Sequence, residues 1–287
     1  MKKKLICTIS ILVLAAALCS GCSTAPFKIT DSFASYYAKN KEEVGSDLKG
    51  MASDLAVLSD SEATDPNYQS NDYADLLIND STNEVLESYH CFDRLYPASI
   101  TKVMTALLTL EHGNMDDEIT LKHDINLTEN GAVISTLTKG DTVTVGQVFH
   151  TMLIKSANDC AVILAEYVAG SESKFIDMMN AKAKELGATH THFVNPNGLH
   201  DNNHYTTAYD LYLIFKEAVK YDTFVDTVSS KDYTMTYTTP KKTQINEYMQ
   251  STNYYLLNEF PVPEGVVMYG GKTGTTSMAK SCLILMT

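Results

Sequence analysis

A serine and a lysine stand three residues apart at the start of an apolar run, at Ser99 and Lys102 of the segment YPASITKVMTALLTL (residues 96–110). Residues at i and i+3 lie on one face of a helix, so the lysine amine would lie beside the serine hydroxyl. The rest of the run is apolar on nearly every side, which is typical of a buried helix. Burial lowers the pKa of a lysine, and a neutral amine can accept the proton of a serine. The pair is therefore a candidate nucleophile with its base.

Ser99 could instead cap this helix, because serine is a favoured N-cap and Pro97 just before it suits a helix entrance. The spacing S-x-x-K is also a weak signal by itself, since it recurs at Ser46, Ser171 and Ser277. The first two of these serines lie in polar stretches, and the third follows a Gly/Thr turn. The apolar surroundings of Lys102 therefore favour chemistry at Ser99, where a helix N-terminus also directs N–H groups at a developing oxyanion.

A second short motif, Ser156-Ala-Asn158, falls between two segments whose periodicity predicts helices. Helix capping would explain one of these polar residues, but it explains both less readily. The same S-x-N spacing at Ser81–Asn83 lies in a predicted hairpin turn, which accounts for it fully. Ser156 and Asn158 are therefore candidate partners of the first pair.

A third motif, Lys272-Thr273-Gly274, occurs once in the chain, within YGGKTGTTS. This segment has the pattern of a strand that ends in small residues. We expect the glycines at 270, 271 and 274 to let a ligand's backbone approach closely. Lys272 and Thr273 would then bind an anion such as a carboxylate. The alternative is a lysine beside a tight turn at a sheet edge.

The order of the elements predicts an α+β fold. YADLLIND (73–80) and EVLESYH (84–90) flank the turn-rich DSTN and indicate a β-hairpin. Residues 110–220 are mainly helical in pattern, with a candidate capping box from Thr207 to Asp210, and strand-like segments return from 233 onward. We expect an antiparallel sheet packed with helices and interrupted by an inserted helical subdomain.

The N-terminal residues predict a secretory signal. Three lysines (2–4) precede an apolar stretch too short to span a bilayer comfortably. The signal ends in LCSGC, which resembles a bacterial lipoprotein signal and makes Cys22 a candidate lipidation site, although Cys19 stands where Leu is usual. Ordinary cleavage nearby and an uncleaved anchor are the alternatives. We therefore expect a signal peptide over 1–22, a polar spacer over 23–70 and the folded domain over 71–287.

Charge and cysteine spacing exclude several classes of protein. The chain has 35 acidic and 22 basic residues, a formal net charge of −13. Removal of the three signal lysines makes this −13 − 3 = −16. With no basic stripe, nucleic-acid binding is not expected. The cysteines outside the signal, Cys91, Cys160 and Cys282, fit neither a disulfide framework nor a zinc pattern, and are expected to be buried thiols.

The three motifs S-x-x-K, S-x-N and K-T-G, in this order, resemble those of the penicillin-binding proteins and serine β-lactamases. Their surroundings are similar to the D-alanyl-D-alanine carboxypeptidases, the low-molecular-mass penicillin-binding proteins. The similar segments are YPASITKVMTALL, SANDCAVILAE, FVNPNGLHDNNHYTTAYDL and GGKTGTTSMAKSCLI. The resemblance runs from about residue 71 to the end of the sequence, roughly three-quarters of the chain.

This resemblance implies the chemistry of each residue. Ser99 would attack the carbonyl of a D-Ala–D-Ala peptide bond in a peptidoglycan stem peptide, and Lys102 would take its proton. Ser156 would pass a proton to the leaving nitrogen, and Asn158 would orient Lys102 and the substrate amide. Water would then hydrolyse the acyl-enzyme and free the serine. β-Lactams would acylate Ser99, and neither a metal nor an organic cofactor is implied.

It also implies the substrate-binding residues. Lys272 and Thr273 of the K-T-G motif, which ends at Gly274, would bind the terminal carboxylate. The backbone N–H groups of Ser99 and Thr275 would form the oxyanion hole. The enzyme would act outside the cytoplasm, anchored to the bacterial membrane as a lipoprotein through Cys22, or secreted.

Two departures from the family pattern stand out. Lys280 occupies a position where the family usually has glycine, and it is expected to crowd the turn into the next strand. Family members also continue with more sheet, a final helix and often a further domain. The C-terminal end of the domain is therefore expected to be missing, either by truncation or as an incomplete fold. A lipid on Cys22 could replace a membrane tail as the anchor, but not a strand and a helix.

Other functions remain as alternatives. A metallopeptidase would use His200 and His204, but HDNNH has no glutamate in the catalytic place and lies in a loop. A serine β-lactamase has the same motif order, but no glutamate loop for deacylation is evident. A muropeptide endopeptidase would use the same residues. A catalytically dead muropeptide- or penicillin-binding domain is the alternative from another class.

Overall fold

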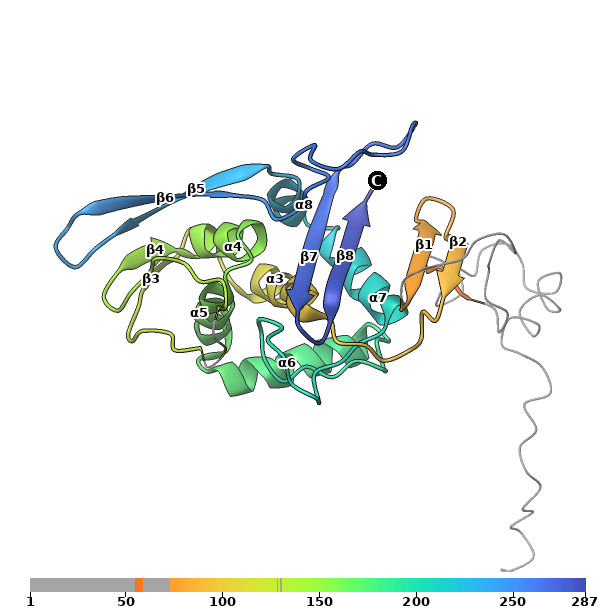
Figure 1. Cartoon of the computed structure of the whole chain (residues 1–287). Helices are drawn as coiled ribbons and strands as arrows, with labels where there is room; N and C mark the ends of the chain where they lie inside the picture. The colour runs from red at the N-terminus through yellow and green to blue at the C-terminus, as the bar shows by residue number, and fades with distance from the viewer. Residues whose placement is uncertain (1–54, 59–72, 128, 130) are drawn as a thin grey trace, which may run out of the picture. The chain divides into compact units, whose positions relative to one another are not determined.

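The computed structural model describes residues 55–58, 73–127, 129 and 131–287 (Figure 1). The predicted signal peptide, the Cys22 lipid site and most of the predicted spacer over 23–70 lie outside the described residues. Within the described part of the chain, no helix is both long and apolar enough to cross a membrane.

Six α-helices and one 3₁₀ helix are found among the described residues. They are η1 (Ala98–Thr101), α3 (Lys102–His112), α4 (Val145–Ile154), α5 (Asn158–Ala169), α6 (Glu172–Glu185), α7 (Ala208–Ala218) and α8 (Asp222–Val228). Three begin with a side-chain cap, in which the hydroxyl of Thr144, Ser171 or Thr207 accepts a backbone N–H three residues ahead. These caps account for the starts of α4, α6 and α7.

The predicted capping box at α7 is only half formed. Thr207 Oγ1 accepts from the Asp210 backbone N–H at 3.0 Å. The Asp210 carboxylate instead accepts from the His190 N–H and the Thr191 hydroxyl. The helix start is therefore tied to the preceding segment rather than closed on itself.

The strands form three antiparallel sheets in the described residues. The predicted hairpin is confirmed as β1 (Asp75–Asn79) paired with β2 (Glu84–Tyr89). The second sheet has the order β3-β4-β5-β6, formed by Glu118–Thr120, Thr142–Thr144, Asp232–Thr238 and Gln244–Gln250. The third pairs β7 (Gly270–Thr276) with β8 (Lys280–Met286). The α+β class and the antiparallel pairing are confirmed.

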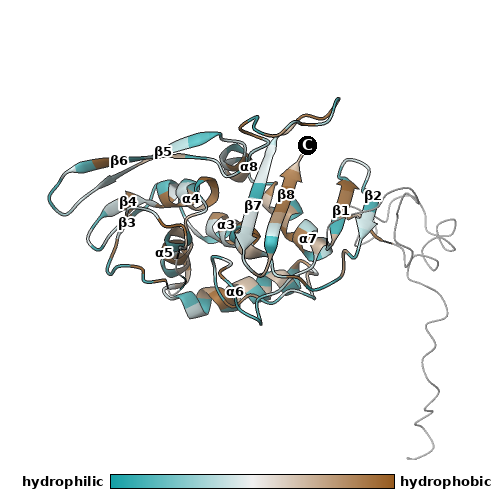
Figure 2. Cartoon of the chain, viewed as in Figure 1, coloured by the Kyte–Doolittle hydropathy of each residue, from teal (hydrophilic) through white to brown (hydrophobic). Residues whose placement is uncertain are grey.

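Helix α3 lies at the centre of the core. It contacts α4, α5, α6 and α7, and all of its residues from Lys102 to Thr109 are buried. Figure 2 shows hydrophobic residues gathered on these packed elements, whereas the projecting β5–β6 hairpin is mostly pale or hydrophilic. A helix buried all round holds its side chains in fixed positions. The segment that begins at Lys102 therefore provides a rigid base for the site.

The connection between β7 and β8 bears on the expectation for Lys280. The Lys280 side chain is exposed, so it does not crowd the turn as expected. The Lys280 backbone, however, has φ 59°, in the left-handed region. This conformation costs a non-glycine residue about 1 kcal/mol or more. We expect Lys280→Gly to raise the free energy of unfolding by about 0.5 kcal/mol, because glycine's greater unfolded-state entropy offsets part of the relief.

Urea denaturation checks this expectation. The matched control is Lys231→Gly at another exposed lysine, whose backbone φ is not positive. The control should lower stability, because only the entropic cost of glycine remains. An equal loss of stability in both variants would contradict the strain at Lys280.

Candidate active site

Ser99 lies in the 3₁₀ turn η1, which runs directly into α3. The N-cap of η1 is Pro97, which makes no side-chain cap hydrogen bond. The Ser99 hydroxyl is half-buried and contacts the Lys102 amine at 2.8 Å. Ser99 therefore stands in the first turn, as a capping residue would, but its hydroxyl faces the lysine.

Lys102 is fully buried, with 0% of its surface exposed. Its Nζ contacts Asn158 Oδ1 at 2.8 Å and the Asn197 carbonyl at 2.6 Å, in addition to Ser99 Oγ. Burial lowers the pKa of Lys102 well below its usual value, and the nearby Lys272 lowers it further. The two carbonyl oxygens can only accept, so they occupy both N–H groups of a neutral amine. In this neutral form, which the lowered pKa favours, the lone pair of the amine is left to accept the proton of the Ser99 hydroxyl.

A second serine–lysine pair faces the first. Lys272 on β7 is 1% exposed, and its Nζ donates to Ser156 Oγ at 3.0 Å and to the Thr273 carbonyl at 2.8 Å. Burial lowers the pKa of Lys272 to about 7. Ser156 has φ 64°, an uncommon conformation for serine that turns the chain between α4 and α5. The site therefore holds two hydroxyls, each within hydrogen-bond reach of a buried amine.

Asn158 connects the first pair to the rest of the fold. It is the first residue of α5 and is 5% exposed. Its backbone N–H and its Nδ2 both donate to the Val133 carbonyl, at 2.8 and 3.0 Å. With the amide nitrogen held in this way, Oδ1 is directed at Lys102 and fixes the position of its amine.

The glycines of β7 make room for the protein's own backbone, which the sequence did not predict, whereas the expected approach of a ligand stays a prediction. A Cβ on Gly274 would lie 2.9 Å from the Ser99 backbone nitrogen. On Gly270 and Gly271 it would lie 2.4 and 2.1 Å from the carbonyl oxygens of Val228 and Ile284. Gly274 thereby lets β7 pack directly on η1, and this packing places the K-T-G segment beside Ser99.

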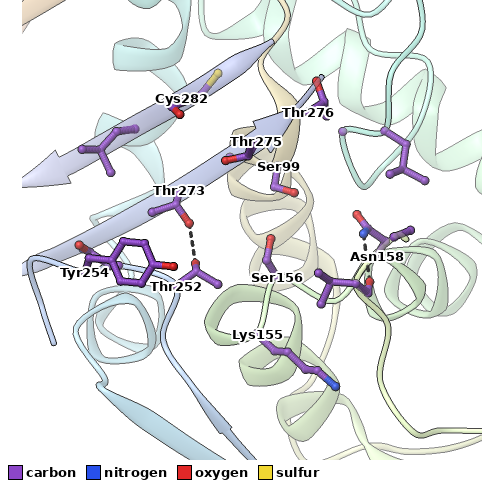
Figure 3. A pocket seen from close by; sticks show the side chains of 18 of the residues that line it. Ser99, Lys155, Ser156, Asn158, Thr252, Tyr254, Thr273, Thr275, Thr276 and Cys282 are labelled. Atoms are coloured by element: carbon purple, nitrogen blue, oxygen red, sulfur yellow. Dashed lines mark hydrogen bonds between the residues drawn. The ribbon is translucent and has the colours of Figure 1, made fainter. Parts of the chain in front are cut away.

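The site opens into a cleft of about 600 Å³. Figure 3 shows Ser99 and Ser156 pointing into the same space, with Thr273 and Thr275 alongside them on β7. Thr273 Oγ1 contacts Thr252 Oγ1 at 2.5 Å. The lining also includes Asn158, Gly274, Lys155, Val133, Leu199, Tyr254, Tyr255, Phe260 and Cys282. Lys102 and Lys272 lie behind this surface, with their amines against the two serine hydroxyls.

All the residues that the sequence predicts for the site meet at this cleft or directly behind it, apart from Cys22 outside the described residues. Sequence reasoning missed the Asn197 carbonyl, the Val133 carbonyl and Thr252. Backbone carbonyls carry no signal in side-chain identity, so the first two could not be found from residue types. Thr252 lies within STNYYLL, where the only signal is another S-x-N spacing.

The competing S-x-x-K serines lie in other environments. Ser171 caps α6, and Ser277 is exposed beside the β7–β8 turn, while Ser46 lies outside the described residues. Ser99 is thus the serine of this spacing that meets a buried lysine in the described part of the chain.

The histidines of HDNNH do not form a metal site. Among the described residues, no group of three or more His, Cys, Asp or Glu side chains could hold a metal. His204 is 2% exposed, and both of its ring nitrogens have protein partners. The geometry therefore gives no support to a metallopeptidase centred on His200 and His204.

The cysteines outside the predicted signal are not suited to act as nucleophiles. Cys91 and Cys160 are buried, as expected. Cys282 is half-buried at the cleft, and burial raises the pKa of its thiol to about 11. A thiol with so high a pKa is a poor nucleophile at neutral pH, so the serines remain the candidate nucleophiles.

Known sequences and structures include proteins similar to this chain. A family model described as D-alanyl-D-alanine carboxypeptidase matches residues 60–287. D-alanyl-D-alanine carboxypeptidase DacF of Bacillus subtilis is 35% identical over 212 residues, which cover 72% of this chain and 52% of that protein. D-alanyl-D-alanine carboxypeptidase DacC of Escherichia coli is 32% identical over 213 residues, covering 71% of this chain and 50% of its own.

Among solved structures, the crystal structure of the Streptomyces K15 DD-transpeptidase matches with a TM-score of 0.65 and 29% identity. This match covers 73% of the present chain and 82% of that one. The chain spans about half the length of the two carboxypeptidases DacF and DacC.

Proposed function

Because this chain belongs to the D-alanyl-D-alanine carboxypeptidase family, we propose that it removes the terminal D-Ala from peptidoglycan stem peptides through an acyl-enzyme on Ser99. The observation that carries the proposal is the contact between Ser99 Oγ and the buried Lys102 amine at 2.8 Å. A serine hydroxyl is a weak nucleophile unless an adjacent base accepts its proton. Lys102, whose burial lowers its pKa, supplies that base.

Acylation begins with Ser99. Its Oγ attacks the carbonyl carbon between the two D-Ala residues, and its proton passes to Lys102 Nζ. The developing oxyanion lies between the backbone N–H groups of Ser99 and Thr275, where the packing of Gly274 on η1 brings the two segments together. The C–N bond then breaks, and the proton held by Lys102 passes to the leaving nitrogen through the Ser156 hydroxyl, which is linked to Lys272. This transfer leaves Lys102 neutral for the next step.

Deacylation and binding use the same residues. Water attacks the Ser99 ester with Lys102 as the base, which releases the shortened stem peptide and restores the serine hydroxyl. Lys272 and Thr273 bind the carboxylate of the terminal D-Ala, and Asn158 holds Lys102 and the substrate amide. A β-lactam resembles the D-Ala–D-Ala end and acylates Ser99 in the same way.

The proposal places the protein outside the cytoplasm, where stem peptides are found. Cys22 at the end of LCSGC is the proposed lipid attachment site. We expect cells that express the full chain to incorporate radiolabelled palmitate into it, and Cys22→Ala to abolish this incorporation. Equal labelling of both forms would contradict lipidation at Cys22.

The experiment that tests the proposed activity uses the purified protein with a peptide ending in D-Ala-D-Ala and with a fluorescent penicillin. We expect release of free D-Ala, and a stable covalent adduct that peptide mapping places on Ser99. A chelator should leave both unchanged. Rapid penicillin turnover without a stable adduct would favour a β-lactamase, and cleavage only of cross-linked muropeptides would favour an endopeptidase. Penicillin binding without D-Ala release would favour the non-catalytic binding domain.

The pKa of Lys272 predicts an alkaline limit to activity. The ammonium form binds the substrate carboxylate, and burial lowers the pKa of this amine to about 7 in the free protein. Above pH 7 the Lys272 amine of the free enzyme therefore loses its positive charge, and kcat/KM should fall about tenfold per pH unit. Lys272→Arg, whose guanidinium stays charged, should lose this alkaline limb. An alkaline limb retained in the variant would show that another group controls it.

A further inference from the structure

The residue just before the nucleophile has a strained backbone. Ala98 is 2% exposed and has φ 47°, in the left-handed region that residues with a Cβ rarely adopt. Such a conformation costs about 1–2 kcal/mol and persists only where its surroundings hold it. The φ of Ala98 sets the direction in which the chain enters Ser99, so whatever holds Ala98 also sets the position of the Ser99 hydroxyl.

A chain of two hydrogen bonds holds this turn. The Ala98 carbonyl accepts from Thr101 Oγ1 at 2.8 Å, and Thr101 Oγ1 lies 2.8 Å from His204 Nε2. The threonine hydroxyl has a single hydrogen, which it gives to Ala98. Its oxygen must therefore accept from His204, so Nε2 carries the hydrogen.

The other ring nitrogen of His204 agrees with this assignment. His204 Nδ1 accepts from the Val194 backbone N–H at 3.1 Å, so it carries no hydrogen. Burial lowers the pKa of His204 to about 4, which keeps the ring neutral at neutral pH. The imidazole is thus fixed in one tautomer and donates toward the turn that carries Ser99.

The segment that carries His204, residues 193–206, contacts both the strained turn and the base. Gly198 in this segment has φ 86°, and a Cβ on it would lie 1.9 Å from the Ala98 carbonyl oxygen. The neighbouring Asn197 carbonyl accepts from Lys102 Nζ at 2.6 Å. The segment therefore packs against the strained turn and holds the lysine amine at the same time.

We propose that Thr101 and His204 are positioning residues, which hold the Ala98 carbonyl and thereby fix the Ser99 hydroxyl against Lys102. This inference rests on the proposed function, in which Ser99 is the nucleophile. Neither side chain is among the residues that line the cleft, so each acts through the turn. Without the two bonds, Ala98 relaxes toward an ordinary conformation and Ser99 Oγ moves away from the amine. A displacement of about 1 Å at a reacting group costs on the order of 100-fold in rate.

The test compares variants of Thr101 in acylation by a fluorescent penicillin. Thr101→Val keeps the shape and loses the hydroxyl, whereas Thr101→Ser keeps the hydroxyl. The matched control is Thr109→Val on α3: Thr109 is also buried, at 0% exposure, but its hydroxyl donates to the Thr105 carbonyl within that helix. We expect the acylation rate at saturating penicillin to fall about 30- to 100-fold in Thr101→Val. It should stay within about threefold of the wild-type rate in Thr101→Ser and Thr109→Val.

The half-saturating penicillin concentration separates positioning from general damage. It should stay within about twofold in Thr101→Val, because the binding residues on β7 are untouched. Labelling of Thr101→Val at the wild-type rate would overturn the inference, as would an equal loss in Thr109→Val. If the wild-type protein were not labelled at all, the proposed function itself would fail, which is a distinct result.

A second pair of variants carries the test if Thr101→Val does not fold. His204→Phe removes the Nε2 donor, whereas His204→Gln can place an amide N–H near Thr101. We expect the Phe variant to acylate about tenfold or more slowly than the Gln variant. Equal rates would contradict a role for the His204 donor.

Discussion

Ser99→Ala is expected to abolish covalent labelling by a fluorescent penicillin and to reduce D-Ala release by about 10⁴-fold or more. The substitution removes the oxygen that forms the ester, while the rest of the cleft can still bind substrate. Fold and stability should change little, because Ser99 is only half-buried and the substitution removes a single oxygen, which contacts the Lys102 amine. Gel-based labelling and a D-Ala oxidation assay measure the two losses.

A second serine of the chain provides the control for this experiment. Ser277 has the same S-x-x-K spacing, with Lys280 as its lysine, but it is exposed. Ser277→Ala should label and release D-Ala within about twofold of the wild-type protein. Full labelling of Ser99→Ala would show that another nucleophile in the cleft, with Ser156 the first candidate, forms the adduct.

The parts of the site that sequence predicts well are those fixed by local structure. The i, i+3 relation of Ser99 and Lys102 requires only that residues 98–112 be helical, and the apolar pattern of that segment indicates burial. No local sequence pattern explains why Ser99 and Lys102 lie close to Lys272, which is far along the chain. This proximity depends on the packing of β7 on η1, which a single glycine, Gly274, permits.

The elements that sequence reasoning missed share a physical feature, the lack of a readable apolar pattern. Strands β3 and β4 have three residues each, too few for an alternating pattern to be recognised. Strand β6, QINEYMQ, is mostly polar and exposed, because it lies in the projecting hairpin. The strand predicted within YGGKTGTTS is confirmed as β7, which begins at Gly270; the exposed Tyr269 before it still donates its backbone N–H to the Met286 carbonyl of β8.

The backbone contributions lie beyond what residue types can reveal. The Asn197 and Val133 carbonyls hold Lys102 and Asn158, and any residue at either position could supply the same oxygen. The left-handed φ of Ala98 is likewise invisible, because alanine is not a residue expected there. Sequence therefore identifies the groups that react, and the structure identifies what holds them in place.

Lys102→Met should slow acylation by about 10³-fold while leaving the protein folded. The variant keeps a side chain of similar length in a fully buried position, but it removes the base that accepts the Ser99 proton. The Asn158 Oδ1 and Asn197 carbonyl oxygens lose their donor, at a cost of about 1–3 kcal/mol each. The variant also avoids the desolvation cost of burying an amine, which offsets part of this loss of stability. Thermal denaturation should therefore show a protein that is still folded at room temperature.

A second substitution separates proton transfer from charge. Lys102→Arg retains a cation at the same site, but a guanidinium does not lose its proton at any working pH. If Lys102 acts as a neutral base, the form that its lowered pKa favours, the arginine variant should be as slow as the methionine variant at every pH. If instead a positive charge beside Ser99 were sufficient, Lys102→Arg would retain most of the acylation rate.

The control for the loss of a lysine is Lys182→Met, which breaks the ion pairs of Lys182 with Glu111 and Glu185 away from the cleft. It should acylate within about twofold of the wild-type rate, because the Ser99–Lys102 contact is untouched. A loss in this control as large as in Lys102→Met would show that the rate reports general damage to the fold. Stopped-flow acylation across about pH 5–9 therefore decides between a base and a fixed charge, and it does so at the contact from which the proposed activity follows.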